Sequence, residues 1–221
     1  MNTRLTSFLF IIALTGFFSC KNNDNVLPQE ILKGSFKFVN ASSNSLNYFL
    51  NGTRINSGGS LPPGYATFYF TTPLGQQNFE FKTDGSPDVL FAWPELIDSL
   101  NHTLYITGST ADKAFRTNDT LFVDTGFVAL SFVNAAPDAG SLDVFVGDTL
   151  RFSGKEFKSK AAFTPVADGE REIKVFKSGT NTLLADTTFT MNLNHIYTLY
   201  SYGQPGGTGN SKFGVGITLN L

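Results

Sequence analysis

Apolar and polar residues alternate over most of this chain. Val128, Leu130 and Phe132 are separated by single residues, and the same spacing runs through residues 213–221. An apolar residue at every second position is typical of β-strands that bury one face. Segments rich in proline and glycine, which favour turns, separate these runs at residues 62–64, 83–87, 137–140 and 203–210. Beyond the N-terminal apolar run, residues 93–100 could form one helical turn at most, so we predict an all-β fold.

The two halves of the chain repeat one another. The sequence Phe-Val-Asn-Ala at residues 38–41 recurs at residues 132–135, and further matches follow in the same order, offset by about 95 residues. This spacing is too long for a solenoid unit and suits a whole small domain. We predict two tandem immunoglobulin-like or transthyretin-like antiparallel β-sandwich domains, at residues 34–125 and 126–221. The repeated asparagine is expected to bond the backbone of the turn that follows it.

The N-terminus has the features of an export signal. Arg4 precedes an apolar run at residues 5–18, which is too short to span a bilayer, and Cys20 follows. This arrangement resembles a bacterial lipoprotein signal, in which the cysteine after the cleavage site carries the lipid (palmitate). We therefore expect a signal peptide at residues 1–19 and a lipidated Cys20 that begins a polar tether at residues 20–33. The alternative is an ordinary secretory signal cut near Ser19.

The charge of the chain limits its partners. The formal net charge is −2, and no cluster of lysine and arginine is present. A basic patch or stripe normally marks a protein that binds nucleic acid, and a polybasic cluster marks one that binds anionic lipid headgroups. We therefore expect no nucleic-acid partner, and we expect contact with the membrane only through the lipid on Cys20. This places the protein in the cell envelope, on the outer membrane, with its orientation left open.

Residues suited to catalysis or metal binding are sparse. His102 and His195 fall at matching places in the repeat, where each follows an asparagine and is expected in a turn. Neither has further ligands at the spacing of a zinc site, and no nucleophile motif is present. A pair of carboxylates could still meet in space. The acidic residues considered, all at polar strand positions or in turns, are Glu80, Asp143, Glu172 and Asp186. We predict no enzyme, no metal and no cofactor.

A carbohydrate surface is the more specific functional hypothesis. Sugar-binding sites use exposed aromatic faces, and aromatic residues occur near expected loops or strand ends at Trp93, Tyr65, Tyr200 and Tyr202. Trp93 is the first candidate, because the proline after it indicates an edge strand or a loop. The competing interpretation is that these rings belong to the core.

Four aspartate-serine or aspartate-threonine sequences resemble the O-glycosylation motif of Bacteroidota. The acceptors would be Ser99, Thr120, Thr149 and Thr187. The alternative is that these pairs only mark the beginnings of strands.

The second half resembles a known family. The sequences VALSFVNAAPDAGSLDVFVGDT, from Val128, and HIYTLYSYGQ, from His195, are similar to the domain-of-unknown-function 4397 family. The first half lacks the proline and the acidic residue of this pattern, so we interpret it as a diverged copy. The resemblance implies a bacterial extracytoplasmic β-sandwich, often in lipoproteins and often in tandem, with no catalytic residues. The lipoprotein start and the composition also resemble proteins of Bacteroidota.

Together these patterns predict a non-enzymatic, lipid-anchored envelope protein that serves as a binding or structural module. Its partner would be a glycan or another envelope protein. The first alternative is a glycan-binding accessory lipoprotein of a polysaccharide uptake system, and the second is a carboxylate-based hydrolase.

Overall fold

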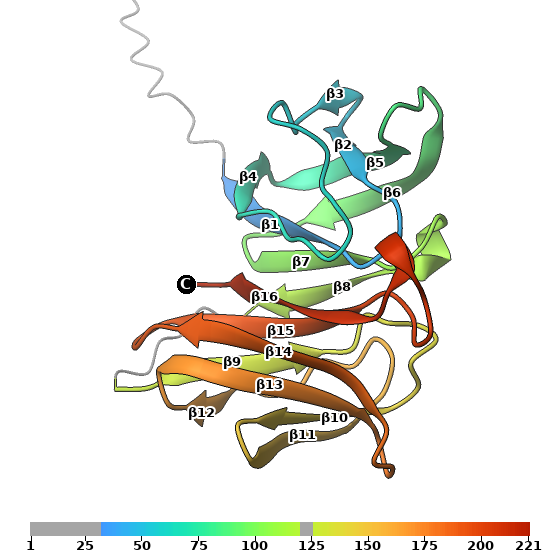
Figure 1. Cartoon of the computed structure of the whole chain (residues 1–221). Coiled ribbons are helices and arrows are strands. Elements are labelled where there is room, and N and C mark those ends of the chain that lie inside the picture. Colours follow the sequence, from blue (N-terminus) through green and yellow to red (C-terminus); the bar gives the residue numbers. More distant parts are fainter. Residues whose placement is uncertain (1–31, 120–125) are drawn as a thin grey trace, which may run out of the picture. The chain divides into compact units, whose positions relative to one another are not determined.

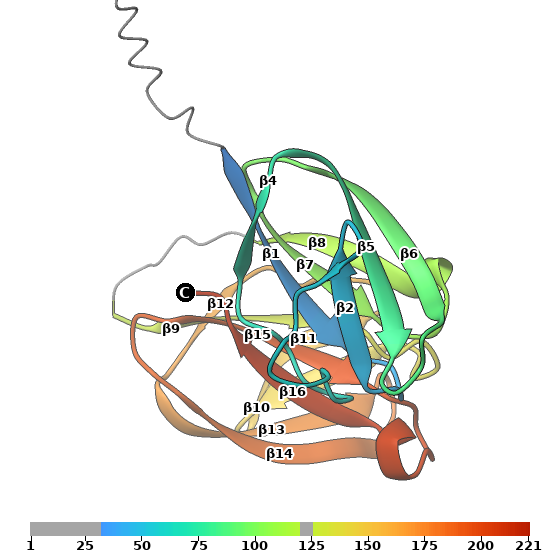
Figure 2. The same ribbon diagram turned by 90° about the horizontal axis from the view of Figure 1, so that it is seen from above.

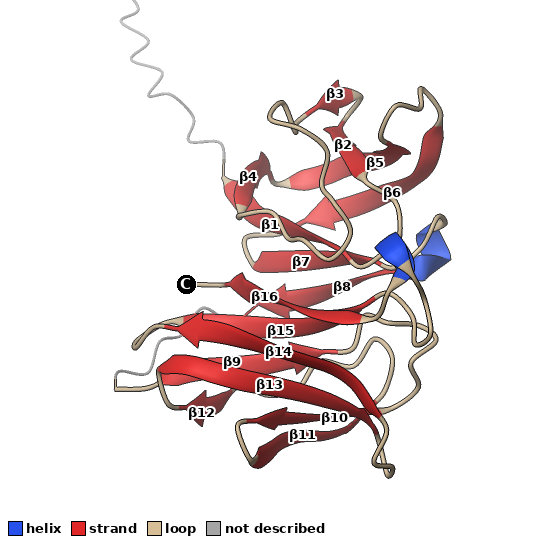
Figure 3. Ribbon diagram, viewed as in Figure 1, coloured by secondary structure: helices blue, strands red, loops and turns tan. Residues whose placement is uncertain are grey.

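The computed structural model describes residues 32–119 and 126–221. The expected signal peptide, Cys20 and Thr120 lie outside these residues. The described chain is built from strands, with two short 3-10 helices at Ala111–Lys113 and Gly209–Ser211 (Figure 3). The prediction of an all-β fold with two sandwich units is confirmed. Ile31–Leu221 form one compact unit.

Each half supplies eight strands. Those of the first are β1 (Lys33–Asn40), β2 (Leu46–Leu50), β3 (Thr53–Arg54), β4 (Phe70–Pro73), β5 (Gly75–Thr83), β6 (Val89–Ile97), β7 (Asn101–Ile106) and β8 (Ala114–Asp119). Those of the second are β9 (Val128–Val133), β10 (Leu142–Val146), β11 (Thr149–Lys155), β12 (Thr164–Val166), β13 (Gly169–Lys177), β14 (Leu183–Met191), β15 (Ile196–Tyr202) and β16 (Gly214–Leu219).

The two halves share one topology. The first sandwich pairs the sheets β4-β1-β7-β8 and β3-β2-β5-β6, and the second repeats this order as β12-β9-β15-β16 and β11-β10-β13-β14 (Figures 1 and 2). Most pairs are antiparallel, but β1 pairs with β7 and β9 pairs with β15 in parallel. Parallel neighbours need a long connection, which the intervening strands of the other sheet provide. The alternating pattern therefore predicts the strands, but it does not show that one strand pair in each sandwich is parallel.

The helical turn considered for residues 93–100 is wrong. Trp93 and Glu95 lie in β6, where they pair with Phe79 and Gln77 of β5. Pro94 is accepted because β6 is an edge strand of its sheet.

Each sandwich has its own core. Phenylalanines dominate the first, where the ring of Phe38 lies 5.3 Å from that of Phe79 and 5.2 Å from that of Phe81, both nearly perpendicular. Aliphatic side chains dominate the second, around Phe132. The two sequences thus fill the same architecture with different side chains, which explains why only part of the repeat can be read in the sequence.

A third apolar cluster joins the sandwiches. It combines Val39, Ala41, Tyr105 and Phe115 of the first with Val133, Ala135 and Tyr200 of the second. Figure 1 shows the sheets that contain β1 and β9 next to each other, between the two outer sheets. These inner sheets are therefore buried on both faces, as is usual for sheets that contain parallel strands.

The repeated asparagine closes the turn after the first strand of each sandwich. The side-chain amide of Asn134 donates to the carbonyls of Gly140 and Lys155, both at 2.9 Å. Its oxygen accepts from the Ala136 amide and the Ser201 hydroxyl. Asn40 bonds its own loop in the same manner. Both asparagines are fully buried, so the prediction for this residue is confirmed.

Replacing Asn134 by alanine should therefore destabilise the second sandwich strongly. The change leaves the buried Ala136 amide and the buried Ser201 hydroxyl without this acceptor, and it removes the donor to two partly exposed carbonyls, at a cost of about 2–4 kcal/mol. Urea denaturation measures this, with Asn192→Ala as control, because Asn192 is exposed. Equal stability of the two variants would contradict the structural role of Asn134.

Candidate functional site

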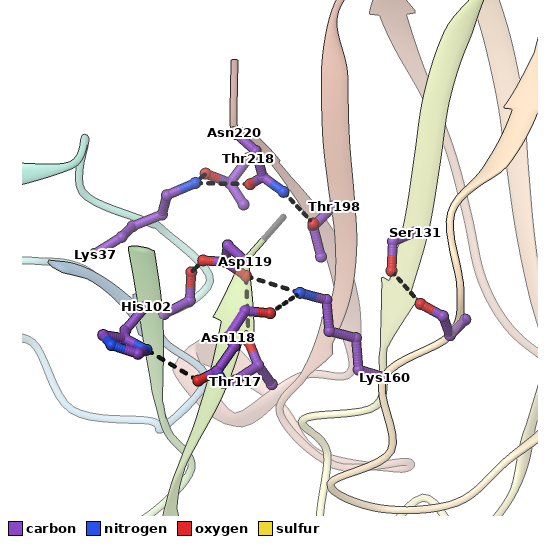
Figure 4. Close-up of polar contacts among 12 residues, drawn as sticks. Lys37, His102, Thr117, Asn118, Asp119, Ser131, Lys160, Thr198, Thr218 and Asn220 are labelled. Atoms are coloured by element: carbon purple, nitrogen blue, oxygen red, sulfur yellow. Dashed lines mark hydrogen bonds and ion pairs between the residues drawn. The ribbon is translucent and has the colours of Figure 1, made fainter. Parts of the chain in front are cut away.

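A buried lysine connects the two sandwiches. Lys37 of β1 is fully buried. Its Nζ donates to Thr218 Oγ1 at 3.0 Å and to Asn220 Oδ1 at 2.9 Å (Figure 4). It also donates to the Leu219 carbonyl at 2.7 Å. An ammonium has three protons to donate, so each one has an acceptor. Burial nevertheless lowers the pKa of Lys37 to about 8, although Asp119 opposes the shift.

Asp119, at the end of β8, organises the rest of this polar cluster. Its carboxylate accepts from the Lys160 ammonium at 2.8 Å (Figure 4). It also accepts from the Tyr69 hydroxyl at 2.6 Å and from the hydroxyl of Thr103. Burial and this carboxylate raise the pKa of Tyr69 well above its usual value. Lys160 belongs to the second sandwich, so the ion pair crosses the same join as Lys37. These groups bond one another, and the arrangement is that of an interdomain contact.

The two histidines do not occupy matching places. Phe38 pairs with Leu104, and its repeat partner Phe132 pairs with Leu199. Leu104 therefore matches Leu199. His102, two residues before Leu104, corresponds to Tyr197 and not to His195. The sequence match failed because His102 lies two residues before Leu104, whereas His195 lies four residues before the matching Leu199.

His102 is also not in a turn. It is buried in β7, and its ring nitrogens lie 2.7 Å from Asp98 Oδ1 and 3.0 Å from Asn118 Oδ1. These two partners compensate the burial of the ring. His195 does precede β15 in a turn, where Nδ1 lies 2.9 Å from the Leu193 carbonyl.

Most of the acidic residues considered in the sequence have hydrogen-bond or ion-pair partners nearby. Asp143 accepts from the backbone amides of Gly154 and Gly179, and Glu172 pairs with Lys174 on the same strand. Glu80 accepts from Asn78. None of the four hollows described on the surface is lined by two carboxylates; Asp186 is the one acidic residue in the hollow of about 420 Å³.

Trp93 is separated from the tyrosines. It is half-buried against the first core, and its indole nitrogen donates to Glu95 at 2.8 Å. By contrast, Tyr65, Tyr200 and Tyr202 line one hollow of about 440 Å³. The structure thus brings together three of the four aromatic candidates, and it excludes Trp93 from this group.

This hollow lies between the sandwiches. One wall is the stretch Gly64–Phe68, which Asn40 and Phe38 of β1 hold by backbone hydrogen bonds of 2.9 Å to Tyr65 and Thr67. The other wall is the strand β16, with Tyr200 and Tyr202 of β15. Tyr65 is 63% exposed and Phe68 is 88% exposed. A phenylalanine with that exposure is not part of a core, and Phe68 is not among the residues that the sequence predicts for a site.

Two glycines fix the position of Tyr202. A Cβ at Gly64 would lie 2.6 Å from the Tyr202 ring, and a Cβ at Gly214 would lie 2.4 Å from it. Any larger residue at either position would displace the ring. The neighbouring Tyr200 donates its hydroxyl to the Gly64 carbonyl at 2.9 Å. The two glycines therefore leave room for the Tyr202 ring, and the Tyr200 hydroxyl is bonded to the opposite wall of the hollow. We refer to Tyr65, Phe68, Tyr202 and the hollow beside them as the aromatic groove.

The expected O-glycosylation acceptors lie in different settings. Ser99 is exposed in a bend before β7, and Thr149 is exposed at the first position of β11. Thr187 is partly buried within β14. Their modification stays a prediction.

Two further features bear on function. In residues 32–119 and 126–221, no group of three histidine, cysteine or acidic side chains could hold a metal ion. No helix of the described residues is long and apolar enough to cross a membrane.

Comparison with known proteins supports the family resemblance for the second sandwich. The family described as Domain of unknown function (DUF4397) matches residues 128–214. These residues exclude the first sandwich, whose description as a diverged copy stays a prediction. No curated protein matches the chain.

Two solved structures show weak similarity. One is described as alpha-glucan recognition by family 41 carbohydrate-binding modules from streptococcal virulence factors; the alignment has 14% identity, covers 76% of this chain and 92% of that one, and has a TM-score of 0.26. The other is a leucine-rich repeat protein from Bacteroides thetaiotaomicron, with 15% identity, 79% and 26% coverage, and a TM-score of 0.22. At these TM-scores neither similarity carries an argument.

The buried lysine predicts an unusual pH dependence. The pKa of Lys37 is about 8 in the folded protein and has its ordinary value of 10.5 when the chain unfolds. Between these values the unfolded chain binds more protons, so the free energy of unfolding should rise with pH, by up to about 3 kcal/mol. Urea titrations from about pH 7.5 to 9.5 measure this rise below the range in which the tyrosines ionise. The variant Lys37→Met should lose most of it; an unchanged pH dependence would contradict the assignment.

Proposed function

We propose that this protein is a non-enzymatic, lipid-anchored binding module of the bacterial cell envelope, and that the aromatic groove binds carbohydrate. The observation that carries the proposal is the exposure of Tyr65 and Phe68, 63% and 88%, beside a hollow at the join of the two sandwiches. Burying such rings against a ligand is favourable because they are large and apolar.

The groove combines apolar faces with groups that can bond hydroxyls. Thr67 and Thr218 line the same hollow as the rings, and β16 forms one of its walls. β16 pairs only with β15 among the described strands, so one edge of its backbone has no strand partner. Ligand sites are typically apolar surfaces with a few polar groups that fix orientation. Pyranose rings, which have an apolar face and hydroxyls around it, fit this combination.

The alternative of a carboxylate-based hydrolase has little support. Glycoside hydrolysis uses two carboxyl groups about 5–10 Å apart, and no carboxylate lines the hollow beside Tyr65. The lining of this hollow therefore favours binding of a carbohydrate without cleavage of its bonds.

The location in the envelope rests on the sequence. The short apolar run and Cys20 support export and lipidation, and the absence of a basic cluster leaves the lipid as the membrane contact. We place the protein on the outer membrane. Whether it faces outward determines whether a surface polysaccharide or a periplasmic glycan is the natural ligand.

Removing the exposed ring should weaken carbohydrate binding without unfolding the protein. A glycan array probed with the soluble part of the chain identifies the ligand, and Phe68→Ala should then weaken binding by about tenfold or more, since truncation of a central aromatic contact costs at least about 1.4 kcal/mol. Leu96→Ala is the matched control, because Leu96 is 67% exposed on β6 and lines none of the hollows. Equal binding by both variants would contradict the site.

Changing Cys20 to serine should release the protein from the membrane. The wild-type protein should pellet with outer membranes and incorporate labelled palmitate, whereas Cys20→Ser should do neither, because the lipid is the expected anchor. Protease treatment of intact cells then reports the orientation of the anchored form. Membrane association of Cys20→Ser would contradict lipid anchoring.

A further inference from the structure

The hollow beside Tyr65 runs along the edge of a strand. Five consecutive residues of β16, Val215–Leu219, line it. Successive side chains of a strand point to opposite faces, so a hollow on one face would be lined by alternate residues. Lining by consecutive residues places the hollow at the open edge of β16, where backbone groups are directed.

The hydrogen bonds at the end of this strand show which backbone groups face the hollow. The Asn220 amide donates to Ile196 of the β15 side, at 2.7 Å, whereas the Leu219 carbonyl points the other way and accepts from Lys37. Because the direction alternates along an antiparallel strand, the amides and carbonyls of Ile217 and Val215 face the open edge too. They repeat every two residues, roughly 7 Å apart.

Two more hollows continue this one. A hollow of about 380 Å³ shares Thr67 and Phe68 with it, and the hollow of about 420 Å³ shares Tyr202. Phe68 and Tyr202 thus stand at the two boundaries between three adjacent hollows. The wall formed by β16 alone is roughly 17 Å long, from the rise per residue of a strand.

We propose that the ligand of the aromatic groove is an unbranched polysaccharide that lies along β16 and occupies all three hollows, with sugar rings stacked at Phe68 and Tyr202. This inference rests on the proposed carbohydrate function and specifies its ligand. A monosaccharide or a chain end would contact only one of the hollows.

An extended peptide fits this edge less well. A peptide that adds to a sheet needs a continuous row of backbone donors and acceptors, and Lys37 already occupies the Leu219 carbonyl. Of the residues that face this edge, Val215 and Ile217 keep both the amide and the carbonyl available. That stretch is shorter than a usual strand of five to six residues. Hydroxyls of a linear sugar chain need only separate contacts at a regular spacing.

Calorimetric titration with defined oligosaccharides tests the proposal. The probes are the cello-, malto-, xylo- and chito-oligosaccharide series, each from the disaccharide to the hexasaccharide. In the series that binds, affinity should rise by at least about tenfold between the disaccharide and the longer members, as additional hollows are filled. In Phe68→Ala this rise should shrink, because the variant loses the ring between two hollows.

Two variants separate the outcomes. Asn210→Ala alters an exposed residue of the hollow beyond Tyr202, so it should weaken only the longer members of the series. Leu96→Ala should bind every member as the wild-type protein does. Affinity independent of length would overturn the extended mode and leave the carbohydrate function in place. Binding of extended peptides with no binding of any oligosaccharide would overturn both.

Discussion

The structure depends on the burial of two sheets on both faces. Each sandwich contributes the sheet that contains its first strand, β1 or β9. The faces of these two sheets that point away from their own cores meet across Val39, Tyr105, Val133 and Tyr200. A lysine and an aspartate are buried at this join, where an unpaired charge would be costly. Lys37 reaches three acceptors of the second sandwich, and Asp119 receives Lys160 from it. All three acceptors of Lys37 belong to the second sandwich, so this buried ammonium is satisfied only when the two sandwiches pack together.

The candidate site is a consequence of this pairing. The stretch Gly64–Phe68 lies on the edge of one inner sheet and β16 on the edge of the other, so the two edges meet only because the sheets pack together. Two glycines then hold Tyr202 in place. The loop after Pro63 also supplies the most exposed ring. One sandwich alone would present only one wall of this hollow.

Much of the fold could be predicted from the sequence, because alternation depends on local burial. Phe36, Phe38, Leu130 and Phe132 face the cores as their spacing indicates. The same rule fails at Lys37, Thr103, Ser131 and Thr198, which read as solvent-facing and are buried at the join. The local sequence pattern does not show that the second face of a sheet is covered by another sheet. The match of His102 with His195 is wrong for a related reason, since only the strand register shows that Tyr197 is the residue that corresponds to His102.

The site could be predicted only in part. Tyr65, Tyr200 and Tyr202 were found by their places near turns, whereas Trp93 was selected for the proline beside it and packs against the core. Phe68 was missed because phenylalanine in a β-protein is usually buried, and only the structure shows its 88% exposure. The most direct test of the account is nuclear magnetic resonance mapping of the labelled protein with a bound oligosaccharide. We predict that the backbone amide resonances of residues 64–68 and 215–219 shift together when the oligosaccharide binds. Shifts confined to one sandwich would contradict it.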